Sequence, residues 1–321
     1  MYGSLGVQAL KHFARFTWFL LAYTLCVILW GAFVRATGSG AGCGSHWPLC
    51  NGEVIPRAAT LETLIEFTHR LSSGLLGAFV LVALVWAYRL YPRRHLVRAL
   101  VLGVVLLVLS EALIGAGIVR FEWVAENVSI ARLLTMAFHL LNTFFLVAVM
   151  TALCWVVAND FHGPLPRLES HSLLALIAVL VVGMSGAVIA LGDTLVLGAG
   201  LNPEDSPLLA RIVAARWTHP GLAIAAFATT GLASWRQYAR HLPSVHPVPL
   251  RTARWAVGLF ALQLALGGVN VWLRAPVTIQ LAHLLLSDLI WICLVLSALG
   301  YAAAAAAPVR GDFEPRHERM A

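Results

Sequence analysis

Long apolar stretches separated by short polar segments run through the whole chain. Each stretch holds about 20 or more mainly apolar residues, the length that a helix needs to cross the hydrocarbon core of a bilayer. Such a segment is helical because lipid offers the backbone no hydrogen-bond partner. The pattern therefore predicts an all-α integral membrane protein with eight transmembrane helices, near residues 14–36, 64–88, 96–119, 132–157, 171–192, 209–235, 253–273 and 277–305.

The composition agrees with this pattern. Of the 321 residues, 60% are hydrophobic and 12% are charged, whereas soluble domains carry roughly 25% charged residues. Lys and Arg gather in alternate connecting segments, and the positive-inside rule then puts both termini in the cytoplasm. Because the basic residues are spread over several short segments, the net charge of +7 reflects topology, and no nucleic-acid partner is expected. We expect the polar tail after Pro308 to be disordered.

The chain contains an internal repeat. The matching segments are "GAFVRATGSG" from Gly31 with "GAVIALGDTL" from Gly186, "EALIGAGIV" from Glu111 with "QLALGGVNV" from Gln263, and "MAFHLLNTFFL" from Met136 with "QLAHLLLSDLI" from Gln280. They divide the protein into two halves, 1–160 and 161–321. Each half has an even number of spans, so we expect an axis along the membrane normal to relate them. We also expect each half to be a four-helix bundle with cofactor sites between facing helices.

Four histidines are predicted to lie inside spans, at matched points of the two halves. They are His69, His139, His219 and His283, on the second and fourth helix of each half. At 1.5 Å per residue all four lie about 9–16 Å below the outer surface. One such histidine would more often hydrogen-bond a neighbouring helix. Four at one level, paired within each half, favour axial ligands of haem iron.

Two other roles for these histidines compete with haem ligation. A closed zinc site needs four ligands close together, and each half offers two histidines at this depth, so zinc is disfavoured. A proton relay is the remaining alternative, because ionisable groups inside a membrane are functional by default. A relay, however, does not account for the repetition of the pair.

The first outer loop carries a pair of cysteines in "GSGAGCGSHWPLCNGEVIP". Cys43 and Cys50 are separated by six residues among glycines. The extracytoplasmic side permits disulfides, so we predict a bond between them. A structural staple and a redox function are equally compatible with this pair.

A charged residue precedes one histidine of each half by one helical turn. Glu66 lies three residues before His69, and the matched position before His219 is Arg216. Residues three apart share a helix face. A carboxylate there can take a proton or stabilise developing positive charge, which makes Glu66 the candidate catalytic residue. The alternative is an ion pair between Glu66 and Arg70, one turn further on.

Three arginines are candidates for binding anionic groups of a haem. A guanidinium suits a propionate, and the candidates are Arg35, Arg132 and Arg216. Snorkelling of these long side chains to the membrane interface explains each position equally well.

The chain resembles the haem A synthases of bacteria and mitochondria, of the bacterial type with cysteines in the first loop. The segments that carry the resemblance are "VRATGSG" leading into "CGSHWPLCNGE", "EFTHR" at His69, "FHLLNT" at His139, "WTHPGLA" at His219 and "AHLLLSD" at His283. They extend over nearly the whole chain. The resemblance implies two pseudo-symmetric four-helix bundles, an oxidation of a methyl group of haem O to a formyl group, and a haem B bound in one half.

Combined with the residues, the resemblance gives a site assignment. We expect substrate haem O between His69 and His139, and haem B between His219 and His283. The expected partners are membrane lipid, a haem O synthase that delivers the substrate, and an electron acceptor that the sequence does not identify. Two alternatives stay open: a bis-histidine cytochrome that only carries electrons, and a haem carrier without chemistry of its own.

The sequence departs from the family pattern in two places. The second half has no cysteine pair after Gly186, unlike some relatives. Glu111 stands where Gln263 stands in the other repeat, and glutamine is expected at both positions.

Overall fold

The computed structural model describes residues 4–57, 59–240 and 247–306, so the expected disorder after Pro308 lies outside the described residues. Within these ranges the secondary structure is helical and contains no β-strand. The α-helices are α1 (Ser4–Ala36), α2 (Leu61–Leu90), α3 (Leu96–Arg120), α4 (Ile130–Ala158), α5 (Ser170–Asp193), α6 (Pro207–Ala214), α7 (Thr218–Ala239), α8 (Pro247–Trp272) and α9 (Val277–Ala306).

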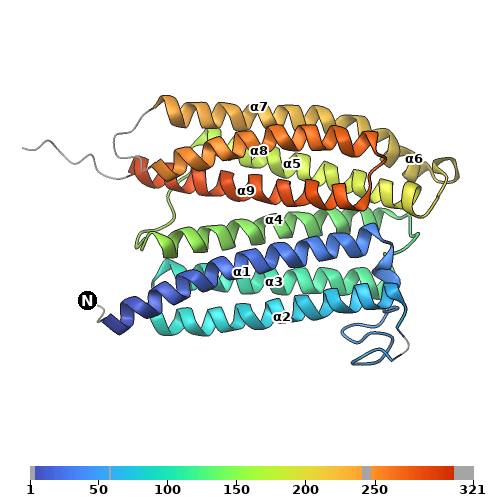
Figure 1. Ribbon diagram of the computed structural model, residues 1–321, viewed down its shortest axis with the longest axis horizontal. Helices are drawn as coiled ribbons and strands as arrows, with labels where there is room; N and C mark the ends of the chain where they lie inside the picture. The colour runs from blue at the N-terminus through green and yellow to red at the C-terminus, as the bar shows by residue number, and fades with distance from the viewer. Residues whose placement is uncertain (1–3, 58, 241–246, 307–321) are drawn as a thin grey trace, which may run out of the picture.

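The long helices form two groups of four, which run side by side in Figure 1. In the first group α1 packs on α2, α2 on α3, α3 on α4, and α4 back on α1. The second group repeats this ring with α5, α7, α8 and α9. In each ring the second and fourth helices, α2 with α4 and α7 with α9, therefore lie diagonally across the group.

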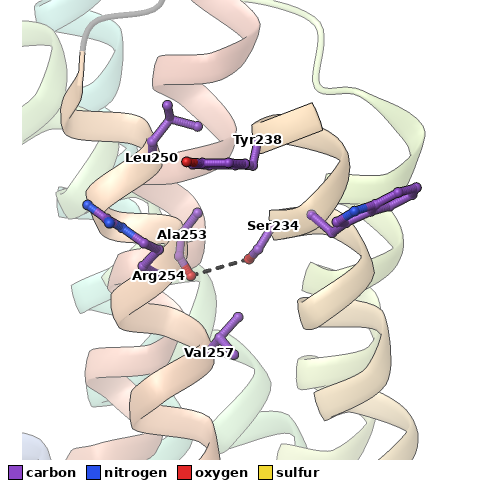
Figure 2. A pocket seen from close by; sticks show the side chains of 7 residues that line it. Ser234, Tyr238, Leu250, Ala253, Arg254 and Val257 are labelled. Carbon is purple, nitrogen blue, oxygen red and sulfur yellow. Dashed lines mark hydrogen bonds between the residues drawn. The ribbon is translucent and has the colours of Figure 1, made fainter. Parts of the chain in front are cut away.

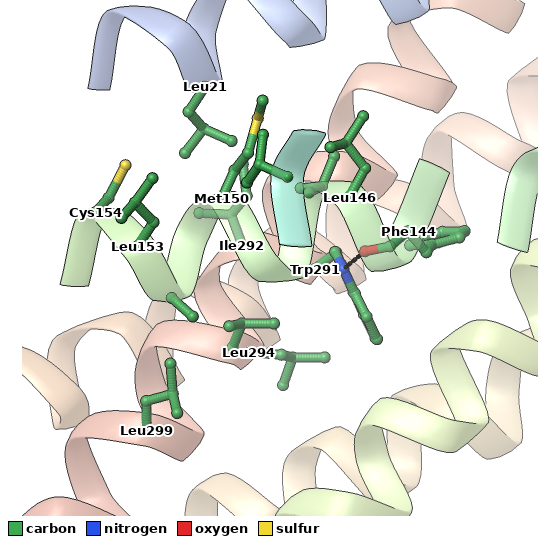
Figure 3. Packing of buried hydrophobic residues seen from close by; sticks show 14 of the residues in the cluster. Leu21, Phe144, Leu146, Met150, Leu153, Cys154, Trp291, Ile292, Leu294 and Leu299 are labelled. Carbon is green, nitrogen blue, oxygen red and sulfur yellow. Dashed lines mark hydrogen bonds between the residues drawn. The ribbon is translucent and has the colours of Figure 1, made fainter. Parts of the chain in front are cut away.

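The two groups meet along α4 and α9, with further contacts of α4 with α5 and of α1 with α9. In this interface the Trp291 indole Nε1 donates a hydrogen bond of 2.8 Å to the Phe144 carbonyl, and the two rings meet edge to face (Figure 3). A Cβ on Gly183 of α5 would lie 2.6 Å from the Phe144 ring. Glycine at this position therefore allows α5 to approach α4 closely.

Seven helices are long and apolar enough to cross a membrane, so the chain is a multi-pass membrane protein of the all-α class. They are α1 to α5, α8 and α9 among the described residues. The predicted limits agree with the observed ones to within a few residues for most helices; the span predicted at 96–119, for example, is α3. Polar caps explain several starts, such as the Ser129 side chain that accepts from the Arg132 amide at the beginning of α4.

The sixth predicted span, 209–235, is wrong as a continuous helix. It consists of α6, a 3₁₀ turn (η4, Ala215–Trp217) and α7. Pro220 explains the break, because proline has no amide hydrogen and its ring clashes with the carbonyl four residues earlier, which belongs to Arg216. The interruption directly precedes His219.

Candidate functional site

The structure brings the four histidines together as one pair in each helix group. The imidazoles of His69 on α2 and His139 on α4 are close enough to interact electrostatically, and so are those of His219 on α7 and His283 on α9. All four side chains are half-buried. Within the described residues no hydrogen bond reaches the Nε2 atom of any of them. The two histidines of each pair therefore lie on diagonally opposite helices of their group, and the Nε2 atom of each makes no hydrogen bond within the described residues.

Glycines on the neighbouring helices make room for three of these rings. A Cβ on Gly31 of α1 would lie 2.9 Å from Cε1 of His69, and one on Gly186 of α5 would lie 3.1 Å from Cε1 of His219. Gly267 of α8 stands in the same relation to His283, at 3.3 Å. A side chain at Gly31 would require a shift of the His69 ring, and one at Gly186 or Gly267 would require the imidazole to move by a few tenths of an ångström. These glycines therefore allow the rings to pack close to the neighbouring helix.

The Nδ1 atoms of the rings have different surroundings. Nδ1 of His219 shares a hydrogen bond of 2.8 Å with the hydroxyl of Ser185. Nδ1 of His69 and of His283 is buried without a hydrogen-bond partner. An unpartnered buried polar atom costs about 1–3 kcal/mol. Imidazoles held in place with Nε2 free could bind a haem iron, so the residues present fit such a group.

His139 also makes no hydrogen bond through Nδ1, and it differs from the other three because a carboxylate lies directly against its ring. Its Nδ1 atom is paired with the carboxylate oxygen Oε2 of Glu111 on α3. The other carboxylate oxygen accepts a hydrogen bond of 2.8 Å from the hydroxyl of Thr143. The residue that departs from the expected glutamine is thus in direct contact with a candidate ligand.

Glu66 is buried and both of its carboxylate oxygens are engaged. Oε2 accepts the backbone amide of Cys43 at 2.8 Å, and Oε1 accepts Nη2 and Nε of Arg70 at 2.5 and 3.1 Å. The ion pair named as the alternative is therefore present. Glu66 lies one helical turn before His69, and its catalytic role stays a prediction.

The first outer loop is fastened to the start of α2. The predicted disulfide between Cys43 and Cys50 is confirmed. Nη1 of Arg70 donates to two carbonyls of the loop, those of His46 at 2.6 Å and Leu49 at 2.7 Å. A Cβ on Gly42 would lie 2.5 Å from the backbone of α2, so glycine is required where the loop touches the helix. Glu66 and Arg70 are therefore built into the loop's attachment.

The three candidate arginines are bound by protein groups. Arg35 reaches into the second helix group, where it donates to Ala190 O at 2.7 Å, Thr194 Oγ1 at 2.5 Å and Gln280 Oε1 at 3.0 Å. Arg216 forms an ion pair with Asp193 of the same helix group. Arg132 donates hydrogen bonds to the carbonyls of Val124, Ala125 and Asn127 in the segment before α4.

A groove between α7 and α8 is separate from the histidines. Its lining residues are Ser234, Trp235, Tyr238, Leu250, Ala253, Arg254 and Val257 (Figure 2). Ser234 follows His219 by about four turns of α7, or about 22 Å. No histidine lines this groove, so it is no part of the site described above.

Sequence reasoning missed three kinds of contact at the site: the glycines, the Ser185 hydroxyl, and the partners of Arg35 and Arg216. The glycines had a signal, because Gly31 and Gly186 occupy the same place in the aligned repeats. The polar partners gave none, because they come from distant parts of the chain.

Comparison with known proteins supports one family. The family model described as cytochrome oxidase assembly protein, COX15-CtaA, matches residues 14–295. A protein named protoheme IX farnesyltransferase from Thermus thermophilus is 42% identical over 303 residues, which cover 90% of this chain and 48% of that protein. The chain therefore spans about half the length of this relative.

Shorter matches link the chain to named haem A synthases. The one from Alkalihalophilus pseudofirmus is 46% identical over 97 residues, 30% of this chain and 33% of that protein. The one from Geobacillus kaustophilus is 47% identical over 106 residues, 32% and 33% of the two chains. Because the family model covers most of the chain, the protein belongs to the COX15-CtaA family of cytochrome oxidase assembly proteins, the haem A synthase family.

Proposed function

We propose that the protein is a membrane-bound oxidoreductase that converts haem O into haem A by oxidising one methyl group to a formyl group. The observation that carries this proposal is a pair of histidines on the diagonally opposite helices of each group, with three of the four imidazoles packed against glycines of a neighbouring helix. Membership of the family supports the reaction class.

The proposed architecture has two pseudo-symmetric bundles, 1–160 and 161–321, and eight spans. In support, the contacts between the groups are reciprocal: the fourth helix of each group packs on the first helix of the other. The broken segment α6–η4–α7 serves as the sixth span in this topology. Both termini are cytoplasmic, and the histidines lie towards the outer side.

The proposed sites divide between the bundles. Substrate haem O is held by His69 and His139, and a resident haem B is held by His219 and His283. The haem B supplies electron transfer when bound. Ser185 orients His219 through Nδ1 and leaves Nε2 for the iron.

The proposed role of Glu66 is to stabilise positive charge beside the substrate or to accept its proton. With water as the source of the oxygen atom, converting the methyl to a formyl group releases four electrons and four protons, and an external acceptor has to take the electrons. Positive charge developing next to the macrocycle favours a fixed carboxylate in a water-poor site. The Cys43 amide and Arg70 hold that carboxylate in one orientation. Arg35, Arg132 and Arg216 are proposed to face the propionates.

The name of the Thermus relative suggests a source for the substrate. A protohaem farnesyltransferase makes a prenylated haem, and this chain corresponds to 48% of that protein. We assign the prenyl transfer to the part of the relative that this chain does not match. A haem O synthase is then the proposed supplier of the substrate, acting beside this protein in the same membrane.

The experiment is to produce the protein in a host that makes haem O and no haem A, and to identify the extracted pigments by mass. We expect haem A in host cells that produce the wild-type protein, and haem B in the purified protein. A His219→Ala or His283→Ala variant should lose the haem B. Haem B without any haem A would favour an electron-carrying cytochrome. Release of bound haem from the protein without any chemical change would favour a haem carrier.

A further inference from the structure

The two repeats differ at the residue that faces the histidine of the fourth helix. In the first bundle the Glu111 carboxylate contacts Nδ1 of His139. The matched residue of the second bundle, Gln263, donates from Nε2 to the backbone carbonyl of His283 at 3.0 Å and leaves Nδ1 of that ring without a partner. A charged group thus stands behind one ring and not behind the other.

The carboxylate of Glu111 is aimed at the ring by its surroundings. Thr143, one turn beyond His139 on α4, donates its hydroxyl to the oxygen that the ring does not use, at 2.8 Å. The side chain of Glu111 is 16% exposed, so little water competes for it. In the second bundle the ring of His283 rests on Gly267, whereas a Cβ on the matched Gly115 would meet nothing within 4 Å. The ring of His139 therefore contacts Glu111 and does not pack against Gly115.

Glu111 is not needed to join α3 to α4, because other residues already link these two helices by hydrogen bonds. The hydroxyl of Ser110 donates to Oδ1 of Asn142 at 2.8 Å, and the amide of Asn142 donates to the carbonyl of Leu107 at 3.0 Å. These bonds lie directly beside Glu111 in the same helix pair. The pairing of Glu111 with the imidazole therefore has a consequence for the ring itself.

We propose that Glu111 is a positioning residue that strengthens His139 as a donor and lowers the reduction potential of the iron bound in the first bundle. A carboxylate behind a ligating imidazole fixes the proton on Nδ1, directs the Nε2 lone pair at the metal and makes that nitrogen more basic. A stronger donor favours iron(III) over iron(II). The iron of the first bundle is then easier to oxidise than that of the second. This role of Glu111 rests on the proposed ligation of iron by His139.

The test is a redox titration of the full-length protein loaded with protohaem as the probe. Absorbance at controlled potential gives one midpoint for each haem, and a His283→Ala variant identifies the signal of the first bundle. We expect Glu111→Gln to raise the midpoint of the first haem and to leave the second unchanged. The matched control is Gln263→Glu, which we expect to lower the midpoint of the second haem alone.

The outcomes separate this role from the proposed function. An unchanged first midpoint in Glu111→Gln, with the haem still bound, overturns the role of Glu111 and leaves haem A synthesis standing. The expected shifts in a protein that makes no haem A overturn the proposed function and support the role. A first haem whose spectrum is unaffected by His139→Ala overturns both the role of Glu111 and the site assignment.

Discussion

The two helix groups use the same means of holding an imidazole and surround it differently. In the first group the positions three before and one after the second-helix histidine are Glu66 and Arg70, and both tie the outer loop to a continuous α2. In the second group the matched positions are Arg216 and Pro220. Arg216 pairs with Asp193 of the neighbouring helix, and Pro220 breaks the span just before the histidine.

This contrast separates what binding needs from what chemistry needs. The histidines recur in both groups, and so do the glycines at Gly31 and Gly186, because both groups have to position a ring between helices. The carboxylates at two matched positions differ, because Glu66 and Glu111 of the first group are replaced by Arg216 and Gln263 in the second. A site that only binds and carries electrons has no use for them, so their distribution marks the first group as the proposed site of oxidation.

The largest expected effect is on Glu66. Glu66→Gln keeps the size of the side chain, removes its charge and leaves one accepting oxygen where the carboxylate has two. His69 is untouched, so the protein should still bind haem, while haem A formation falls by about 100-fold, the scale of a lost acid–base or electrostatic group. The measurement is the haem A to haem O ratio in extracted pigments, together with any hydroxylated intermediate that accumulates.

Arg70→Gln is the matched control for this change. It breaks the same ion pair and keeps the carboxylate. If both variants lose activity equally, Glu66 serves to anchor Arg70 and the loop, and the choice of the first group as the catalytic one loses its main support.

An intermediate effect is expected at the glycines, and it should be confined to one group at a time. Gly31→Ala forces a Cβ against His69, and Gly186→Ala forces one against His219. We expect about tenfold weaker haem binding in the affected group, or about 1.4 kcal/mol, measured by haem titration of the purified protein.

Gly115→Ala provides the comparison, because a Cβ there meets no atom within 4 Å. Alanine favours helix over glycine by about 1 kcal/mol, so a general loss of helix stability does not account for weaker binding. Equal losses at both sites in either variant would show that the two groups do not hold haem separately.

The smallest effect concerns the link between α2 and α3, at the other end of the first group from the loop. Nδ1 of His95 caps α3 by accepting the Val97 amide. Burial, and then the nearby His162, lower the pKa of His95 below 6.5, and Asp160 offsets this in part. A lowered folded pKa means that the unfolded chain binds the proton more readily. Stability from this group is thus complete above about pH 6.5 and declines as the pH falls below it.

The check on His95 is the unfolding temperature in detergent at pH 7.5 and at pH 5.5. His95→Asn keeps a capping side chain and removes the titrating group, so it should lose less stability on acidification than the wild type. Haem content should be the same in both proteins at pH 7.5. An identical pH dependence in the two proteins would exclude His95 as the cause.

Much of the fold was predictable because apolar length alone decides where a helix spans a membrane. The spans predicted at 64–88 and 132–157 correspond to α2 and α4 to within three residues at each end. The break before His219 was missed, because proline is tolerated within many transmembrane helices and the hydropathy pattern continues through it.

The site was predictable as far as the repeat exposes it. His69, His139, His219 and His283 stood out because the two halves match, and each pair lies on diagonally opposite helices of its group. Their role as ligands stays a prediction. The partners of Arg35 were beyond sequence reasoning, because they lie as far as 245 residues away along the chain. Only the packing of one group on the other brings them together.

The reach of Arg35 into the second group also constrains how the protein is made. Its acceptors on α5 and α9 are synthesised 155 or more residues later. Until those helices enter the membrane, the guanidinium near the outer end of α1 lacks these three acceptors and has to reach the membrane interface for its hydrogen bonds. The first helix group therefore has its full set of hydrogen bonds only when the second group is packed against it.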